Sequence, residues 1–285
     1  MATLTTAAPQ RAPHTNKPRK PSLPTPANAL RTTIVTVALL LFFFPLVASA
    51  AFGFTLPGEG FTLDPLRDAL VGSDVTTQLL TTGKLALLST LGSLLLLVPT
   101  LLFLHLKAPK LLRFTEWLSV VPYVVPAIAL VGGANLFFRQ VAPSFLVSTY
   151  SLVPFYMVLT LPLVYRSLDA GIRAMDLRTL WTASESLGAG PVQTLLRVVV
   201  PNMRTALLGS SLLSCAMVLG EYALASLLLH STFPVFMVQI GMNQPRAAAA
   251  LSFLTILATW LLLASLTGAS SKRGSKKSTT KGESR

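Results

Sequence analysis

The sequence predicts an all-α, polytopic membrane protein with about six transmembrane helices. Of its 285 residues, 52% are hydrophobic and only 12% are charged, whereas about a quarter of the residues of a soluble domain are charged. The apolar residues gather into runs near the ~20 residues that cross the ~30 Å hydrocarbon core of a bilayer. The basic residues lie at the ends of these runs and in the two tails, as in membrane proteins of fixed orientation.

The apolar runs divide the chain into four parts. Residues 1–29 are rich in Pro, Thr, Ala, Lys and Arg, which predicts a disordered basic tail. Residues 30–74 hold the first transmembrane helix and an external polar loop, residues 75–268 hold the main transmembrane domain, and residues 269–285 form a second disordered basic tail. The six predicted spans cover residues 31–52, 79–104, 114–138, 144–165, 205–229 and 247–266.

The basic residues orient these spans. Nineteen of the 23 lysines and arginines fall in the N-terminal segment up to Arg31, in the C-terminal tail and in the connections after the second and fourth spans. Because basic residues accumulate on the cytoplasmic side of a membrane protein, both termini and the polar connection that begins at Arg166 are predicted to be cytoplasmic. An even number of spans agrees with this orientation.

Several other classes of function are disfavoured. The net charge of +13 is not arranged as a basic face with interleaved aromatic residues, so nucleic acid is not an expected partner. The sequence has no G-x-S-x-G, H-E-x-x-H or paired-cysteine motif, and we therefore predict no catalytic residue, no metal site and no cofactor. The single cysteine, Cys215, lies in an apolar run and is expected to be a buried thiol.

The connection 176–204 is predicted to be a helical hairpin. Its first arm is indicated by a stripe of apolar or small residues at helical spacing, namely Leu177, Leu180, Trp181, Ser184 and Leu187. Gly188 follows the stripe and predicts a left-handed residue at which the first helix ends. Pro191 suits the first position of a second helix, because its missing N–H has no partner there. Pro201 is predicted to close that second helix.

Glu221 is the strongest candidate for a residue on a solute path. It is predicted to lie inside the fifth span, where an ionisable group is costly unless it faces a cavity or a partner. It therefore lines a path, pairs with another polar group of the helix bundle, or lies nearer the outer edge of the membrane. In the third span, two prolines and a pair of glycines are expected to break or loosen the helix. Tyr123 and Asn135 then line a path, or they lie on a kinked helix that packs against its neighbours.

Residues 181–201 resemble the EAA loop of the inner-membrane permease subunits of bacterial ABC importers. The signature of that family is approximately E-A-A-x-x-x-G, nine variable residues, an apolar residue, x, L and P. The matching positions here are Thr182, Ala183, Ser184, Gly188, Val198, Val200 and Pro201. Thr182 replaces the glutamate of the signature, Ser184 replaces its second alanine, and Glu185 is a nearby carboxylate in another register. The resemblance covers residues 75–268 and is greatest for the polyamine-type branch.

The resemblance implies a MetI-like permease fold in which the hairpin forms coupling helices against an ATPase, with no catalysis in this chain. The ATPase-coupling residues would be Thr182, Ala183, Ser184, Glu185, Gly188, Pro191 and Pro201. The implied partners are a cytoplasmic ABC ATPase dimer, a second permease subunit, an extracytoplasmic solute-binding protein and the lipid of a bacterial inner membrane. Polyamines are the favoured solutes, and phosphonate, ferric ion and thiamine are less favoured.

Two other hypotheses remain at this point. In a secondary transporter or channel, residues 176–204 would form a helix that merely lies at the cytoplasmic interface of the membrane. A membrane enzyme is disfavoured by the missing catalytic motifs. The glycine–proline spacing, the cytoplasmic location and the position between the fourth and fifth spans together favour the permease.

Overall fold

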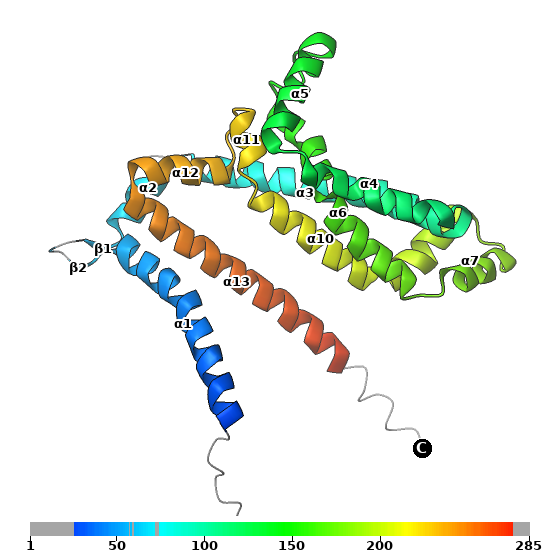
Figure 1. Cartoon of the computed structure of the whole chain (residues 1–285), viewed down its shortest axis with the longest axis horizontal. Helices are drawn as coiled ribbons and strands as arrows, with labels where there is room; N and C mark the ends of the chain where they lie inside the picture. The colour runs from blue at the N-terminus through cyan, green and yellow to red at the C-terminus, as the bar shows by residue number, and fades with distance from the viewer. Residues whose placement is uncertain (1–25, 57, 59, 72–73, 276–285) are drawn as a thin grey trace, which may run out of the picture. The chain divides into compact units, whose positions relative to one another are not determined.

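The computed structural model describes the backbone of residues 26–275 apart from 57, 59, 72 and 73, and the side chains of residues 30–261 apart from these and from 68 and 69. The residues that the structure describes are mostly helical (85%). It divides into two compact units, Met1–Ala48 and Ser49–Arg285. The α-helices, most of them labelled in Figure 1, are α1 (Pro26–Phe54), α2 (Asp64–Val71), α3 (Val75–Lys107), α4 (Leu112–Val124), α5 (Ala127–Val141), α6 (Leu152–Arg173), α7 (Leu177–Ser186), α8 (Pro191–Thr194), α9 (Val200–Asn202), α10 (Arg204–Leu219), α11 (Ala223–Leu227), α12 (Phe233–Asn243) and α13 (Pro245–Ser275).

Shorter elements accompany these helices. They are the 3-10 turns η1 (Pro109–Leu111) and η2 (Thr149–Ser151), the π-helical turn η3 (Leu195–Val199), and the strands β1 (Thr55–Leu56) and β2 (Gly60–Phe61). The two strands pair in antiparallel register. The external loop expected after the first span is therefore partly ordered, as a small β-hairpin followed by α2.

The first unit consists, in its described residues, of the first part of α1. This segment is apolar on all sides, and the described side chains from Leu30 to Val47 are almost all exposed. A helix that is hydrophobic all round and long enough to span a bilayer is suited to lipid contact. The structure therefore agrees with the predicted first span.

Long apolar helices indicate a membrane-embedded protein. In the part of the chain that the structure describes, three helices are long and apolar enough to cross a membrane. The number rises to five when each of two sharply bent helix pairs is counted as one span. The six spans expected from the sequence are thus reproduced only in part.

The predicted third span is broken rather than continuous. Helices α4 and α5 meet at an angle of 95° around Val125 and Pro126, and Figure 1 shows α5 turning sharply away from α4. Val125 has an extended backbone (ψ 120°), as expected for a residue before proline. Pro126 lacks an N–H and therefore cannot continue the hydrogen bonding of α4.

The predicted fourth and fifth spans are displaced or shortened. The helix expected at 144–165 begins at Leu152 and continues to Arg173, because the polar residues after Tyr165 remain helical. The helix expected at 205–229 ends at Leu219, and the short helix α11 follows after Gly220–Tyr222. With 16 residues, α10 alone is shorter than the ~20 residues of a typical span.

The predicted tails differ from the structure where it describes them. Residues 26–29 belong to α1 and residues 269–275 belong to α13, so these two helices extend into the segments predicted as tails. The remainder of both predicted tails, residues 1–25 and 276–285, lies outside the described residues. Helix α12 precedes α13 and was not expected from the sequence.

Helices α3, α6 and α10 form the central bundle of the second unit, where they pack side by side (Figure 1). The bundle contains two clusters of buried apolar side chains. The first cluster includes Leu85, Leu152, Tyr156, Val218 and Leu224. The second cluster includes Leu101, Val164, Leu168, Val199 and Met203. Along each of the three helices, short polar residues occupy the positions between the clusters.

These polar residues form a buried hydroxyl layer across the bundle. The Thr90 Oγ1 donates to Ser214 Oγ at 3.1 Å, and Ser93 Oγ lies 3.3 Å from Thr160 Oγ1. Within a membrane, small residues let helices approach closely, and each hydroxyl bond between helices contributes on average about 0.6 kcal/mol. The layer therefore joins α3 to both α6 and α10 at positions where large apolar side chains would not fit.

Gly171 lies where α6 closely approaches α10. A methyl group added at Gly171 would lie 2.2 Å from Cβ of Ala206, and neither atom is able to rotate away. We expect Gly171→Ala to lower the free energy of unfolding by about 1–3 kcal/mol, since overpacking forces the helices apart. The measurement is reversible unfolding in mixed micelles, monitored by circular dichroism.

Gly133→Ala is the matched control, because no atom lies within 4 Å of the added methyl group. This control should be neutral or more stable by about 0.5–1 kcal/mol, as expected when alanine replaces glycine in a helix. Combining Gly171→Ala with Ala206→Gly should recover much of the loss. Equal stability of Gly171→Ala and Gly133→Ala would contradict the described packing.

Candidate functional site

The candidate site is the hairpin formed by residues 176–204, which joins α6 to α10. Its first arm, α7, begins at Leu177 and is capped by Asp176, the residue before it. The Thr179 amide donates to Asp176 Oδ1 at 3.3 Å and the Thr179 hydroxyl donates to Oδ2 at 2.6 Å. These two hydrogen bonds lower the pKa of Asp176 below its ordinary value of 3.8. An ionised carboxylate at this position also interacts favourably with the helix dipole.

The turn after α7 has the geometry predicted from Gly188. This residue has φ of +80°, in the left-handed region that glycine adopts without steric cost. Its amide donates to Glu185 O at 2.9 Å, and the Ala189 amide donates to Ser184 O at 3.1 Å. This is the Schellman arrangement, in which the amides after a helix satisfy its last carbonyl groups.

The second arm begins as predicted but ends differently. Pro191 is the first residue of α8. The arm then widens into η3 and continues through α9, so Pro201 lies within the arm and does not close it. Pro201 has no N–H to offer the carbonyl of Arg197, and a wider turn accommodates this missing bond. The chain bends by 78° between Asn202 and Arg204, where α10 starts.

One face of the hairpin is part of the bundle core. Leu177, Val199 and Met203 are buried in the second apolar cluster together with residues of α3 and α6. The two arms are joined by Ser184 and Thr194, whose buried hydroxyl oxygens are 2.8 Å apart. Because side chains from both arms lie in one packed cluster, the hairpin and the helices of the bundle are mechanically connected.

The exposed surface of the hairpin carries apolar side chains. The exposed fraction is 88% for Leu187, 67% for Val192 and 59% for Leu196. The predicted stripe of α7 therefore holds at Leu177 and Ser184 but fails at Leu187, because the left-handed turn redirects the chain there. Clustered exposed apolar residues commonly mark a contact surface.

The predicted coupling residues fall on both faces. Thr182, Ala183, Glu185, Gly188, Pro191 and Pro201 are exposed, whereas Ser184 is buried. Glu185 accepts a hydrogen bond of 2.7 Å from Trp181 Nε1. Ser184 thus holds the two arms together, while the six exposed residues are accessible to a partner.

Glu221 lies in the break between α10 and α11 and is buried, with 8% of its surface exposed. Its carboxylate accepts from the amides of Leu224 at 2.8 Å and Ala225 at 3.4 Å, and it also interacts with Tyr156. The carboxylate therefore caps α11, satisfying amides that have no partner within the helix. Among the alternatives for Glu221, this geometry agrees with a carboxylate that pairs with polar groups of the protein.

The three candidates for a solute path are not joined by hydrogen bonds in the described structure. Tyr123 is exposed near the end of α4, and the Asn135 amide donates to Val131 O within α5 at 3.1 Å. Helix α5 does pack against α11, and Val131 and Leu224 of these helices belong to the same buried apolar cluster. The two broken regions of the membrane domain are thus neighbours, although their candidate side chains make separate contacts.

A polar pocket of about 240 Å³ lies beside α11, between it and α12. Its polar lining includes Tyr222, Ser226, Ser231 and Gln239. Leu229, at its edge, has φ of +59° and is 91% exposed. The hydroxyl and amide groups of this pocket offer both donors and acceptors to a bound polar molecule.

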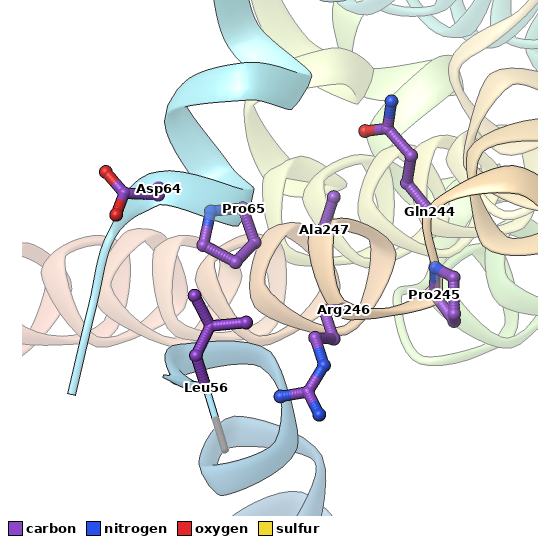
Figure 2. Close-up of a pocket in the computed structure, with 7 residues that line it drawn as sticks. All are labelled: Leu56, Asp64, Pro65, Gln244, Pro245, Arg246 and Ala247. Carbon is purple, nitrogen blue, oxygen red and sulfur yellow. The ribbon is translucent and has the colours of Figure 1, made fainter. Parts of the chain in front are cut away.

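A larger pocket, of about 380 Å³, is shown in Figure 2 where β1 and α2 approach the start of α13. Its two charged side chains already have partners. Arg246 donates to the carbonyl oxygens of Phe52 and Thr55, and Asp64 accepts from the Thr62 hydroxyl. Figure 2 shows the Asp64 carboxylate turned away from Arg246. This pocket is therefore explained by the packing of β1 and α2 against the start of α13.

Sequence reasoning missed one polar cluster near the hairpin. Asp169 accepts from His105 Nε2 at 2.7 Å and from Arg173 Nε at 2.7 Å, which links the end of α3 to the end of α6. The spacing of Asp169 and Arg173, four residues apart, is a recognisable helical ion pair. It was hidden because the sequence predicted a polar connection, not a helix, after Tyr165.

Comparisons with known proteins give no assignment. No family model matches the chain, and no curated protein is significantly similar to it. The function is therefore inferred from the geometry of the hairpin and from the pattern of the sequence.

The capping role of Asp176 predicts a pH-dependent effect. Asp176→Ala should speed amide hydrogen exchange in the first turn of α7 at neutral pH, measured by mass spectrometry, because the Thr179 amide loses its acceptor. The pKa of Asp176 is lowered in the folded state, so its stabilisation is present above pH 3.8 and is lost as the pH falls through the lowered pKa. The difference in amide exchange between the wild type and Asp176→Ala should therefore become smaller as the pH is lowered through this range.

Asp176→Asn serves as the control, because its side-chain oxygen still accepts a hydrogen bond but carries no charge. It should protect the α7 amides with little dependence on pH in this range. Identical exchange in the wild type and in Asp176→Ala at neutral pH would rule out the capping role.

Proposed function

We propose that the chain is the transmembrane permease subunit of an ATP-driven ABC importer and is coupled to a separate ATPase through residues 176–204. The observation that carries this proposal is the two-faced hairpin. One face is packed with Leu177 and Val199 into the core of the bundle, and the other exposes Leu187 and Val192. A partner that pushes on the exposed face moves an element that shares a core with α3, α6 and α10. Such a connection is the physical requirement for transmitting a conformational change.

The charge pattern supports a cytoplasmic hairpin. Arg166, Arg173, Arg178, Arg197 and Arg204 belong to the connection after the fourth predicted span. Basic connections of this kind remain on the cytoplasmic side, where an ATPase has access to ATP. The left-handed Gly188 and the N-terminal position of Pro191 in α8 also match the features on which the likeness to the EAA loop rests.

The broken helices support a solute path. Backbone that is not helical at membrane depth is tolerated where it is buried in protein or lines a water-filled cavity. Two such breaks occur, at Val125–Pro126 and at Gly220–Tyr222, and α5 packs against α11 between them. The polar pocket beside α11 and the candidates Glu221, Tyr123 and Asn135 lie in these same elements.

The proposed assembly contains a cytoplasmic ABC ATPase dimer, a second permease subunit and an extracytoplasmic solute-binding protein, in a bacterial inner membrane with both termini cytoplasmic. The proposed solute is a polyamine, with phosphonate, ferric ion and thiamine as less favoured candidates. The acid Glu221 is the residue that favours a cationic solute.

A secondary transporter is the second candidate, because broken helices near a binding site are also typical of that class. Reconstitution distinguishes the two. We expect purified chain in liposomes to take up radiolabelled spermidine only when its ATPase, the binding protein and ATP are present. Uptake driven by an ion gradient in the absence of any ATPase would instead establish the secondary transporter.

Gly188 provides a test of the turn itself. Gly188→Val places a β-branched side chain in the left-handed region, at a cost of about 1–2 kcal/mol, and should lower ATP-driven uptake by roughly tenfold, since ~1.4 kcal/mol corresponds to a factor of ten in an equilibrium. Gly188→Asn should behave nearly as the wild type, because asparagine tolerates this conformation. Normal uptake by both variants, at equal membrane abundance, would show that the turn is not needed for coupling.

Glu221→Gln separates the charge of Glu221 from its capping role. The glutamine Oε1 still accepts from the Leu224 amide, so α11 should stay capped while the negative charge is lost. We expect lower uptake of a cationic solute, with unchanged membrane abundance and unchanged association with the ATPase. Unchanged uptake would remove Glu221 from the proposed path.

A further inference from the structure

We propose that a pocket in the hairpin receives an acidic side chain, Asp or Glu, of the cytoplasmic ATPase subunit, and that Arg197 pairs with its carboxylate. The inference rests on the proposed function, and it names the chemistry of the partner surface. The size of the pocket, the charges around it and the apolar residues near it support this pairing.

The pocket lies inside the hairpin, between the Gly188 turn and the second arm. Its volume is about 260 Å³, and its lining includes Leu187, Gly188, Gln193 and Arg197. Small-molecule sites typically have volumes of about 300–1,000 Å³. This smaller, open pocket is better matched to a single inserted side chain than to a whole ligand.

The charges of the hairpin are not balanced internally. Its two acids already accept hydrogen bonds within α7, Asp176 from Thr179 and Glu185 from Trp181. Its arginines, in contrast, have no carboxylate partner among the residues that the structure describes. Arg197 is the arginine that lines the pocket. A guanidinium group presents five N–H donors in a planar fork that matches a carboxylate.

The surroundings of Arg197 would strengthen such a pair. Leu187 belongs to the pocket, and the exposed Val192 and Leu196 lie on the same arm as Arg197. When a partner covers these apolar side chains, water is removed and the attraction between opposite charges increases. Thr182 and Ala183, which are also exposed, bring no charge to this surface. The hairpin is therefore complementary to a partner surface on which an acidic side chain has apolar neighbours.

Arg178 supplies a matched control. It is exposed on α7 and does not line the pocket. Reversal of charge at Arg178 changes the net charge of the hairpin as much as reversal at Arg197 does. If binding depends on general electrostatic attraction, charge reversal at either arginine should weaken the affinity for the ATPase equally. If a carboxylate enters the pocket, charge reversal at Arg197 should weaken this affinity more than charge reversal at Arg178.

The test begins with a photo-crosslinking amino acid in place of Gln193 in the full chain, expressed in membranes with its ATPase. Mass spectrometry of the crosslinked peptides identifies the partner residues at the pocket. We expect a peptide of an ATP-hydrolysing subunit in which an Asp or Glu lies next to the crosslinked position. Affinity for the purified ATPase is then measured by biolayer interferometry on chain in nanodiscs.

We expect Arg197→Glu to weaken this affinity by roughly tenfold or more, Arg178→Glu to weaken it much less, and Arg197→Lys to retain part of it. Replacing the identified acid by Lys should restore binding to Arg197→Glu. Crosslinks to an ATPase without an acid at the contact, or equal effects of Arg197→Glu and Arg178→Glu, would overturn the pocket assignment alone. Crosslinks only to proteins that do not hydrolyse ATP would overturn the proposed function as well.

Discussion

The structure depends on the close packing of α3, α6 and α10. In hydrocarbon there is no hydrophobic driving force between helices, so association rests on van der Waals contact and hydrogen bonds. Gly171 lets α6 approach Ala206 of α10, and the layer of buried hydroxyl groups fills the middle of the bundle. The second apolar cluster continues from these helices into the hairpin through Val199 and Met203. The hairpin is thus an extension of the bundle and not a loop attached to it.

A second constraint is the satisfaction of backbone groups where helices break. Pro126 has no N–H, so the break between α4 and α5 leaves no donor unsatisfied at this residue. At the start of α11, the buried carboxylate of Glu221 accepts a hydrogen bond from the Leu224 amide. Glu221, which is proposed to act through its charge, therefore also stabilises the start of α11. If Glu221 contacts solute, binding and the stability of α11 are linked, because both use one carboxylate.

The sequence predicted the features that depend on local chemistry. The left-handed Gly188, the helix start at Pro191 and the apolar stripe of α7 up to Ser184 follow from the steric limits of single residues and from helical spacing. The positions of helix ends in the membrane domain were less well predicted. Hydrophobicity alone does not show that α6 continues through Asp169 and Arg173, where Asp169 pairs with Arg173 of the same helix and with His105 of a distant one. The capping by Glu221 is local, since its carboxylate accepts from amides three and four residues further along the chain, but the helix break that frees those amides was not predicted from hydrophobicity.

The most direct test of the account is whether the exposed face of the hairpin is cytoplasmic and is covered by an ATPase. A single thiol at position 193, introduced by Gln193→Cys in a Cys215→Ala background, is suited to this measurement, because Gln193 is exposed and lines the open pocket. Labelling with a membrane-impermeant maleimide should occur in inside-out vesicles and not in right-side-out vesicles, and added ATPase should protect the thiol. Labelling from the outside, or labelling that the ATPase leaves unchanged, would contradict the central claim.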